Sequence, residues 1–126
     1  MNVLVTGVTG QLGSEVVARF RQLGHTVVAA DRQMLDFLQP AQAAAVIRAQ
    51  QPDWVINCAA YTQVDKAESE PEQAFTINRD TPGQLAQAVA GYGGRLLQLS
   101  TDFVFDGTQT RPYVEDDVTH PLGVYG

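Results

Sequence analysis

The sequence predicts an α/β fold in which a parallel sheet is wound on both faces by helices. Short apolar runs alternate along the chain with segments of helical periodicity, the pattern of strands joined by helical crossovers. The first run, residues 2–6, is rich in β-branched side chains, as expected of a strand buried on both faces. It ends in a glycine-rich turn, residues 7–13, and a helix follows at once. Strand, glycine turn and helix in this order are typical of a Rossmann-type dinucleotide-binding fold.

Five stretches are strand candidates, and one of them is ambiguous because it is either a brief strand or an extended turn. The ambiguous stretch is residues 33–37. Parallel strands with helical crossovers then give a doubly wound sheet of order 3-2-1-4-5. We expect residues 1–126 to form one incomplete NAD(P)-binding domain. The candidates are residues 2–6, 26–30, 33–37, 53–58 and 95–100.

Helices are predicted from apolar spacing and from the residues that start and stop them. Residues 11–23 and the alanine-rich residues 41–51 both have helical periodicity. A third helix is expected over residues 69–89, where Glu72, three residues after the first, would complete a capping box. Pro82 lacks a backbone donor, so we expect a kink or a restart there.

Composition excludes several classes of function. The formal net charge is −6, and 8 basic residues form no cluster, which argues against nucleic-acid binding. The single cysteine, Cys58, allows no internal disulfide and fits a reducing cytoplasm. No signal peptide precedes the first strand, and no apolar run approaches the ~20 residues that span a bilayer. We therefore expect a cytoplasmic protein without a membrane partner.

The glycine turn is the first candidate binding site. Gly7, Gly10 and Gly13 have the spacing G-x-x-G-x-x-G, which differs from the G-x-G-x-x-G of simple dinucleotide binders. The free N–H groups and the dipole at a helix start favour an anion, so a dinucleotide pyrophosphate fits this turn. An ordinary strand–helix connection is the alternative.

Asp31 and Arg32 end the second predicted strand and bear on the choice of cofactor. An acidic residue there accepts hydrogen bonds from ribose hydroxyls and favours NAD. The neighbouring arginine can instead pair with a 2′-phosphate and favours NADP. A solvated turn pair is a third interpretation, and the sequence leaves the choice open.

Polar side chains also follow the last predicted strand. The hydroxyl of Thr101, in Ser100-Thr101-Asp102, can hydrogen-bond a substrate carbonyl or alcohol. Tyr125 lies 24 residues further on, where a helix is expected to begin. Small residues leave the preceding strand at residues 57–60, which allows a flat ring to lie close to the backbone or simply tight packing.

Together these stretches carry a family resemblance. The chain resembles the extended short-chain dehydrogenase/reductase group, and within it the dTDP-4-dehydrorhamnose reductase family. The V-D-K-A-E and S-T-D-x-V-F-x-G stretches are more specific than the glycines. The resemblance covers essentially all of the chain and is carried by residues 7–13, 57–62, 64–70, 100–107 and 121–126.

The resemblance implies an activity and a set of site residues. That family reduces the 4-keto group of dTDP-6-deoxy-L-lyxo-4-hexulose to dTDP-L-rhamnose with NADPH or NADH. Tyr125 would donate the proton, Thr101 would be the hydroxyl partner of the carbonyl, and Thr101 and Asp102 would bind the sugar. The implied cofactor contacts are Gly7, Gly10, Gln11, Leu12, Gly13, Asp31, Arg32, Asp36, Phe37, Ala59, Ala60, Tyr61 and Thr62.

The family pattern also sets expectations about what lies outside these residues. A phenol is a poor acid–base catalyst near neutral pH because its ordinary pKa is about 10. The family places a lysine four residues after the tyrosine, which here falls three positions beyond Gly126. We therefore expect the amino-terminal part of a reductase, with cofactor affinity at best and little or no turnover alone. An unpaired edge at the fifth strand predicts self-association, and a homodimer is expected.

Other interpretations stay open at this point. Some members of the group bind a divalent cation such as Mg²⁺ through an acidic residue of the first helix, and Glu15 lies at about that point. The alternative is that the helix dipole alone favours an acidic residue near the start of a helix. We expect no metal site within this chain. A related nucleotide-sugar epimerase or dehydratase is one alternative function. A non-catalytic NAD(P)-binding subunit, like the regulatory subunit of methionine adenosyltransferase, is another.

Overall fold

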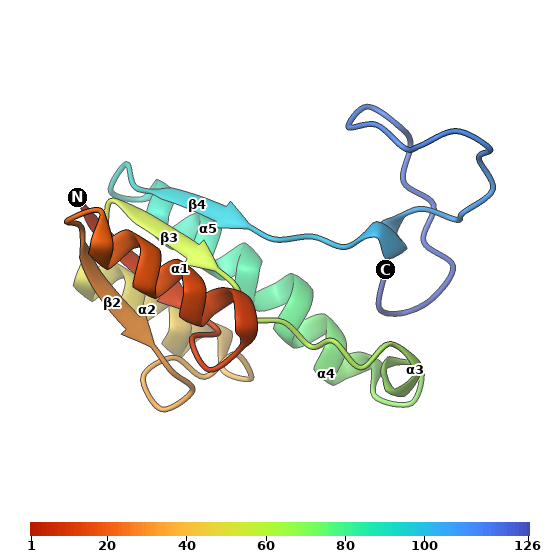
Figure 1. Ribbon diagram of the computed structural model, residues 1–126. Helices are drawn as coiled ribbons and strands as arrows, with labels where there is room; N and C mark the ends of the chain where they lie inside the picture. Colours follow the sequence, from red (N-terminus) through yellow and green to blue (C-terminus); the bar gives the residue numbers. More distant parts are fainter.

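A single parallel sheet organises the fold (Figure 1). The computed structural model describes all of residues 1–126. Its strands are β1 (Asn2–Thr6), β2 (Thr26–Ala30), β3 (Trp54–Asn57) and β4 (Arg95–Gln98), in the order β2-β1-β3-β4. Every pairing is parallel, so the carboxyl ends of the strands meet at one edge.

Helices cover both faces of the sheet, which confirms the doubly wound architecture. Helix α1 (Gln11–Gln22) lies on one face, and α2 (Pro40–Gln50) and α5 (Thr81–Ala90) lie on the other (Figure 1). All three begin and end within two residues of the positions that apolar spacing predicts, except that α5 is the last part of a longer helical run.

The core has two halves because the side chains of a strand alternate between the faces of its sheet. Leu4 of β1 and Val55 of β3 pack among residues of α2 and α5. Val3 and Val5 face the other way, in a smaller cluster that includes Val17 of α1. All four strand residues are fully buried, so β1 and β3 form the rigid centre on which the loops at the carboxyl edge are built.

Residues 33–37 are turns and not a strand, so the sheet has four strands where the sequence allowed five. The carboxylate of Asp31 accepts hydrogen bonds from the backbone N–H groups of Gln33 (3.0 Å) and Met34 (2.9 Å). The Asp31 carbonyl accepts a third from Leu35 (2.9 Å). These N–H groups are therefore engaged locally and do not pair with β2, while the other four strands keep their predicted order.

A long helical run connects β3 to β4. After the short α3 (Val64–Ala67), the chain is helical from α4 (Pro71–Phe75) through the π-helical turn η1 (Thr76–Asp80) into α5. The interruption expected at Pro82 is this π turn, in which the N–H of the residue after η1 donates to a carbonyl five residues back. The predicted capping box is wrong, because the Ser69 hydroxyl donates to the Lys66 carbonyl (3.0 Å).

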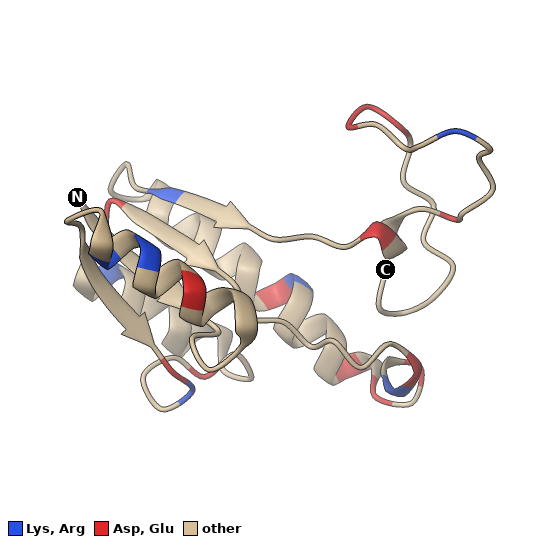
Figure 2. Cartoon of the chain, viewed as in Figure 1, with Lys and Arg blue, Asp and Glu red and all other residues tan.

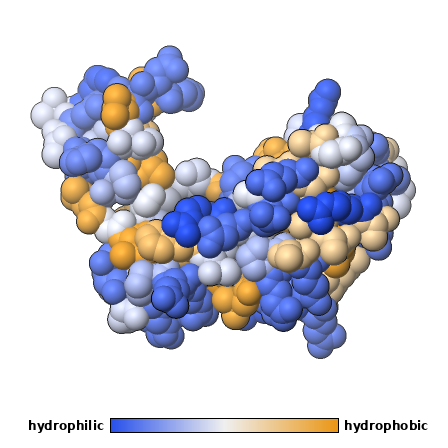
Figure 3. Space-filling view, turned by 180° about the vertical axis from the view of Figure 1, so that it is seen from behind, coloured by the Kyte–Doolittle hydropathy of each residue, from blue (hydrophilic) through white to orange (hydrophobic).

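Residues 99–126 leave the sheet and contain only the short 3-10 helix η2 (Asp102–Val104) (Figure 1). β4 ends at Gln98, two residues earlier than predicted, and no helix begins at Tyr125. Seen from behind, a notch separates the outer part of this segment from the body (Figure 3), while its end packs against the cluster of Tyr61, Ala67 and Ala74. No helix in the structure combines the length and the apolar character that a membrane crossing requires.

Candidate cofactor-binding cleft

A cavity of about 480 Å³ lies at the carboxyl edge of the sheet. The loops that follow β1, β2 and β3 form its walls, together with residues of α3, α4 and η1. Ligands of doubly wound sheets bind outside the carboxyl ends of the strands, at the point where the strand order reverses. Here that point lies between β1 and β3, so the cavity occupies the position expected of a ligand site.

The cavity brings together most of the predicted cofactor residues. It is lined by Gly7, Gly10, Asp31, Arg32, Asp36, Phe37, Ala59, Ala60, Tyr61 and Thr62. Gln11, Leu12 and Gly13 lie next to it in the first turn of α1 but do not line it, and neither do the predicted substrate residues Thr101, Asp102 and Tyr125.

The glycines of the first turn have different roles. Gly7 has a φ of +65°, and a Cβ there would lie 2.5 Å from the carbonyl carbon of Cys58. A Cβ at Gly13 would overlap the carbonyl of Gly7. These two glycines therefore let the turn pack against β3 and against α1. Gly7 also lines the cavity, as does Gly10, which is the N-cap residue of α1.

The start of α1 is open to an anion. No side chain caps the helix, and its first turn holds no acidic residue. The N–H groups of Gln11, Leu12 and Gly13 therefore lack intrahelical partners at the positive end of the helix dipole. This arrangement suits a phosphate group that enters from the cavity.

A chain of polar side chains, buried at Thr6 and Asn57 and exposed at Gln98, crosses three strands beneath the cavity. The Thr6 hydroxyl donates to Asn57 Oδ1 (2.5 Å), and Asn57 Nδ2 donates to Gln98 Oε1 (2.6 Å). Asn57 Oδ1 also accepts the backbone N–H of Ala59 (3.1 Å). Asn57 is fully buried, so these bonds satisfy its amide and fix the first residues of the loop after β3.

The loop after β2 carries both signs of charge (Figure 2). One carboxylate oxygen of Asp31 is committed to the local turn, as described above. Asp36 is similarly engaged, with Leu38 N–H (2.9 Å) and the Gln39 side chain (3.2 Å). The Arg32 side chain is exposed and makes no hydrogen bond or ion pair. Of the two residues proposed to select the cofactor, Arg32 is thus the one left free to meet a phosphate.

The opposite wall is held by a charged network that sequence reasoning missed. Tyr61 Oη donates to Glu70 (2.9 Å), and Lys66 Nζ lies 3.0 Å from the other Glu70 oxygen. The hydrogen bond between Lys66 and Glu70 lowers the pKa of the Glu70 carboxyl. The same bond raises the pKa of the Lys66 amine. Burial, followed by the bond to Glu70, raises the pKa of Tyr61. The only signal in the sequence was the i,i+4 spacing of Lys66 and Glu70.

Asn78, a residue of the π-helical turn η1, fixes the backbone of Tyr61. Its N–H donates to Asn78 Oδ1 (2.8 Å), and its carbonyl accepts from Asn78 Nδ2 (2.9 Å). The loop after β3 has no regular structure of its own at this point, so Asn78 supplies the pairing that a neighbouring strand would give. Asn78 lies 17 residues further along the chain, and no local pattern points to this contact.

The predicted substrate residues lie in the segment after β4. Thr101 Oγ1 accepts the N–H of Phe103 (3.2 Å) and caps η2. The Tyr125 ring meets the Phe103 ring edge-on, with centroids 5.4 Å apart. Tyr125 also packs against the cluster that contains Tyr61 and Ala67. The end of the chain thus returns to the wall of the cavity, and Phe103 links Tyr125 to Thr101.

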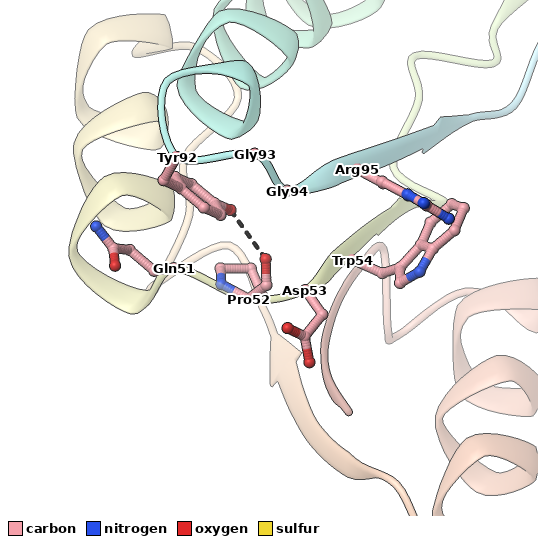
Figure 4. Close-up of a pocket in the computed structure, with 8 residues that line it drawn as sticks. All are labelled: Gln51, Pro52, Asp53, Trp54, Tyr92, Gly93, Gly94 and Arg95. Atoms are coloured by element: carbon pink, nitrogen blue, oxygen red, sulfur yellow. Dashed lines mark hydrogen bonds between the residues drawn. The ribbon is translucent and has the colours of Figure 1, made fainter.

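A second cavity, of about 410 Å³, lies at the opposite end of the sheet (Figure 4). It separates the turn before β3 from the turn before β4. Tyr92 Oη donates to the Pro52 carbonyl (3.0 Å), and the Arg95 guanidinium lies over Trp54, 5.5 Å from the ring centroid. It lies at the other end of the strands from the carboxyl edge, where the predicted residues gather.

Charged side chains form neither a basic stripe nor a metal cluster. Lys and Arg are scattered among acidic residues over the whole molecule (Figure 2). Glu15 is exposed on α1, and nowhere do three or more His, Cys, Asp or Glu side chains gather closely enough to hold a metal ion.

Comparison with known proteins identifies the family. The sequence matches the RmlD substrate binding domain over residues 1–126. The chain belongs to the RmlD family. This match and the relatives below confirm the resemblance that the sequence motifs carry, and the superposition on the solved relatives confirms the Rossmann-type fold.

Curated and solved relatives agree with this assignment. A dTDP-4-dehydrorhamnose reductase of Streptomyces griseus is 46% identical over 98% of this chain and 40% of its own length. A crystal structure of a dTDP-4-dehydrorhamnose reductase from Clostridium acetobutylicum is 38% identical, with a TM-score of 0.95, over all of this chain and 45% of that one. One from Bacillus anthracis, in complex with NADP, is 34% identical with a TM-score of 0.92 over 99% of this chain and 45% of that one. This RmlD-family chain thus spans about two fifths of the length of its curated relatives.

Proposed function

We propose that this chain is the NADPH-binding part of a dTDP-4-dehydrorhamnose reductase. The reaction is reduction of the 4-keto group of dTDP-6-deoxy-L-lyxo-4-hexulose to give dTDP-L-rhamnose. The observation that carries the proposal is the cleft at the carboxyl edge, where the glycine turn, the open start of α1 and the free Arg32 face one cavity. The class of reaction is inferred from relatives in the RmlD family, because those that match almost the whole chain are named dTDP-4-dehydrorhamnose reductase.

The residues present fit a dinucleotide. Gly10 and the N–H groups of Gln11 and Leu12 would hold the pyrophosphate at the start of α1. The adenosine end would lie by Arg32 and the turn of residues 31–38. Residues 59–62, which begin with the small Ala59 and Ala60, would face the nicotinamide. At about 480 Å³ the cavity lies within the usual size range of small-molecule sites.

The remaining chemistry is assigned to residues outside the cavity. The bound cofactor supplies the hydride for the ketone carbon. The Thr101 hydroxyl donates to the carbonyl oxygen and Asp102 binds the sugar. Tyr125 gives its phenolic proton to the oxygen as negative charge develops on it. The packing of Tyr125 on Phe103 and near Tyr61 supports this assignment, because it holds the phenol beside the wall of the cavity.

A charge substitution at the start of α1 tests the cofactor site. Gln11→Glu adds a negative charge in the first turn, where it favours the helix dipole but repels a pyrophosphate. Titration of the chain into NADPH, followed by nicotinamide fluorescence, should show saturable binding that Gln11→Glu weakens at least tenfold. Gln22→Glu makes the same change at the exposed far end of α1 and should leave binding unchanged. Absence of saturable binding to the unmodified chain would refute the proposal.

Cofactor choice is assigned to Arg32. A charge-assisted arginine–phosphate contact contributes about 1.5 kcal/mol or more, which corresponds to about tenfold in affinity. Arg32→Ala should therefore weaken NADPH binding about tenfold and leave NADH binding within about twofold. The control is Arg48→Ala, an exposed arginine on α2 that is not part of the cavity wall. Equal losses for NADH and NADPH would show that Arg32 does not read the 2′-phosphate.

A further inference from the structure

Residues 101–126 contain no strand and no α-helix, yet they fold back on themselves around one carboxylate. Asp106 Oδ1 accepts hydrogen bonds from Thr108 N–H (3.0 Å), Thr108 Oγ1 (2.8 Å) and Tyr113 Oη (3.0 Å). Asp106 Oδ2 lies 3.1 Å from His120 Nδ1. The two bonds from Thr108, the bond with His120 and the bond from Tyr113 all lower the pKa of Asp106. A single side chain therefore collects donors from three positions along the segment.

Two further contacts reinforce this junction. The His120 N–H donates to the Val104 carbonyl (2.8 Å). The ring of Tyr113 stacks on Phe105, with centroids 4.2 Å apart and an angle of 10° between the planes. Both contacts join a residue before Asp106 to a residue after it. The chain on either side of Asp106 thus forms two arms, residues 101–105 and residues 113–126, that are fastened at one point.

Each arm carries one of the proposed active groups. Thr101 lies at the start of the first arm and accepts the N–H of Phe103. Tyr125 lies near the end of the second arm, five positions after His120, and its ring meets Phe103 edge-on. A Cβ at Gly126 would overlap the Phe103 carbonyl, which shows how closely the second arm lies against the first.

The other charged contact of the segment serves a different part of it. Arg111 pairs with Asp117 through both guanidinium nitrogens, at 2.6 and 2.9 Å. Both residues lie between Thr108 and His120, so this pair closes the outer part of the loop. It does not join the arm of Thr101 to the arm of Tyr125. Asp106 is the carboxylate that makes that connection.

We propose that Asp106 is a positioning residue that holds Tyr125 and Thr101 in one arrangement by fastening the two arms of residues 101–126. The proposal rests on the proposed function for the roles of Thr101 and Tyr125. The fastening itself is a property of the chain that is measurable without substrate or cofactor.

The test is the contact between the Phe103 and Tyr125 rings in the full chain, observed as a nuclear Overhauser effect between their ring protons. We expect this signal in the unmodified chain and its loss in Asp106→Ala. Asp106→Asn keeps one carbonyl oxygen for Thr108 and Tyr113 and should retain part of the signal. Unchanged amide signals from β1 and β3 show that each variant still folds.

Two control variants make the test specific. Asp116 is exposed and takes part in none of these contacts, so Asp116→Asn should keep the full signal. Asp117→Asn removes the pair confined to the outer loop and should keep it too. A ring contact that persists in Asp106→Ala, or that is lost equally in Asp117→Asn, would overturn the proposal. NADPH affinity should be the same in all four variants as in the unmodified chain. If neither the unmodified chain nor any variant binds NADPH, that result counts against the proposed function and not against the role of Asp106.

Discussion

At the scale of single residues, Gly7 shows how one position serves both the fold and the site. Its φ of +65° belongs to the left-handed region, and a Cβ there would overlap the backbone of Cys58 and Ala59. From the sequence, the three turn glycines are expected to allow a tight turn, the approach of a phosphate and the packing of helix on strand. In the structure Gly13 allows close packing, Gly10 lines the cavity, and Gly7 does both. Spacing alone does not separate glycines needed for packing from glycines needed for a ligand.

Substitution of Gly7 should therefore be costly for stability. Gly7→Ala places a Cβ against the backbone of the residues that follow β3, and it does so at a φ that alanine rarely adopts. We therefore expect the free energy of unfolding to fall by about 2 kcal/mol or more. Gly83→Ala is the matched control, since Gly83 is exposed in α5 and a Cβ there meets nothing within 4 Å. Alanine is the better helix former, so this variant should gain about 0.5–1 kcal/mol. Urea denaturation measures both, and equal effects would contradict the structural reason.

At the scale of elements, the sequence predicted what periodicity controls and missed what distant contacts control. Helices α1 and α2 and all four observed strands follow their patterns within two residues. The capping box failed because the helix begins at Pro71, whose N-cap residue is Glu70. The Ser69 hydroxyl is meanwhile bonded back to α3. Residues 33–37 form turns because the Asp31 carboxylate accepts hydrogen bonds from the N–H groups of Gln33 and Met34, which a strand would need for pairing. The alternation of apolar residues does not reveal such side-chain bonds to the backbone.

The segment after β4 should loosen in acid. Hydrogen bonds from Arg111 lower the pKa of Asp117 to about 2, and those from Thr108 lower the pKa of Asp106 below its ordinary value of about 4. A carboxylate whose pKa is lower in the folded chain stabilises that state above its unfolded pKa and stops doing so as pH falls through the folded value. We expect the amide signals of residues 101–126 to keep their dispersion at pH 5 and to lose it between about pH 4 and pH 2. Full dispersion at pH 2 would contradict this account.

At the scale of the whole molecule, one side of the sheet is left uncovered. β4 is an edge strand, and α1 does not cover it on the face where Leu97 and Leu99 lie. These side chains are 42% and 41% exposed. The space-filling view shows other apolar groups among hydrophilic ones on the reverse of the molecule (Figure 3). An unpaired strand edge with apolar side chains favours pairing with a second chain.

Self-association of this chain is therefore expected through β4. Size-exclusion chromatography with light scattering should show a mass that rises with protein concentration. Leu97→Lys places a charge on the exposed face and should shift the equilibrium towards monomer, whereas Leu23→Lys, at an exposed leucine after α1, should not. A single monomeric mass for the unmodified chain at high concentration would count against this edge as an interface.

The candidate site was predictable to the extent that it follows from topology. Parallel strands bring their carboxyl ends together, and this rule alone gathers the predicted residues after β1, β2 and β3 into one cavity. The other wall depends on contacts between residues far apart in the chain, such as the bond from the Tyr61 N–H to Asn78. The end of the chain is held in the same way, by the bond from the Val124 N–H to Glu68. The position of Tyr125 depends on the folding of residues 101–126 around Asp106. None of these contacts leaves a periodic pattern in the sequence.

Amide chemical-shift mapping tests most directly whether the carboxyl-edge cavity binds NADPH. On addition of NADPH to the labelled chain, saturable shifts should appear in the turn of residues 7–13, in residues 31–38 and in residues 59–62. The cavity at the opposite end of the sheet, around Pro52 and Tyr92, should show none. Shifts centred on that second cavity, or no saturable shifts at the carboxyl edge, would contradict the account.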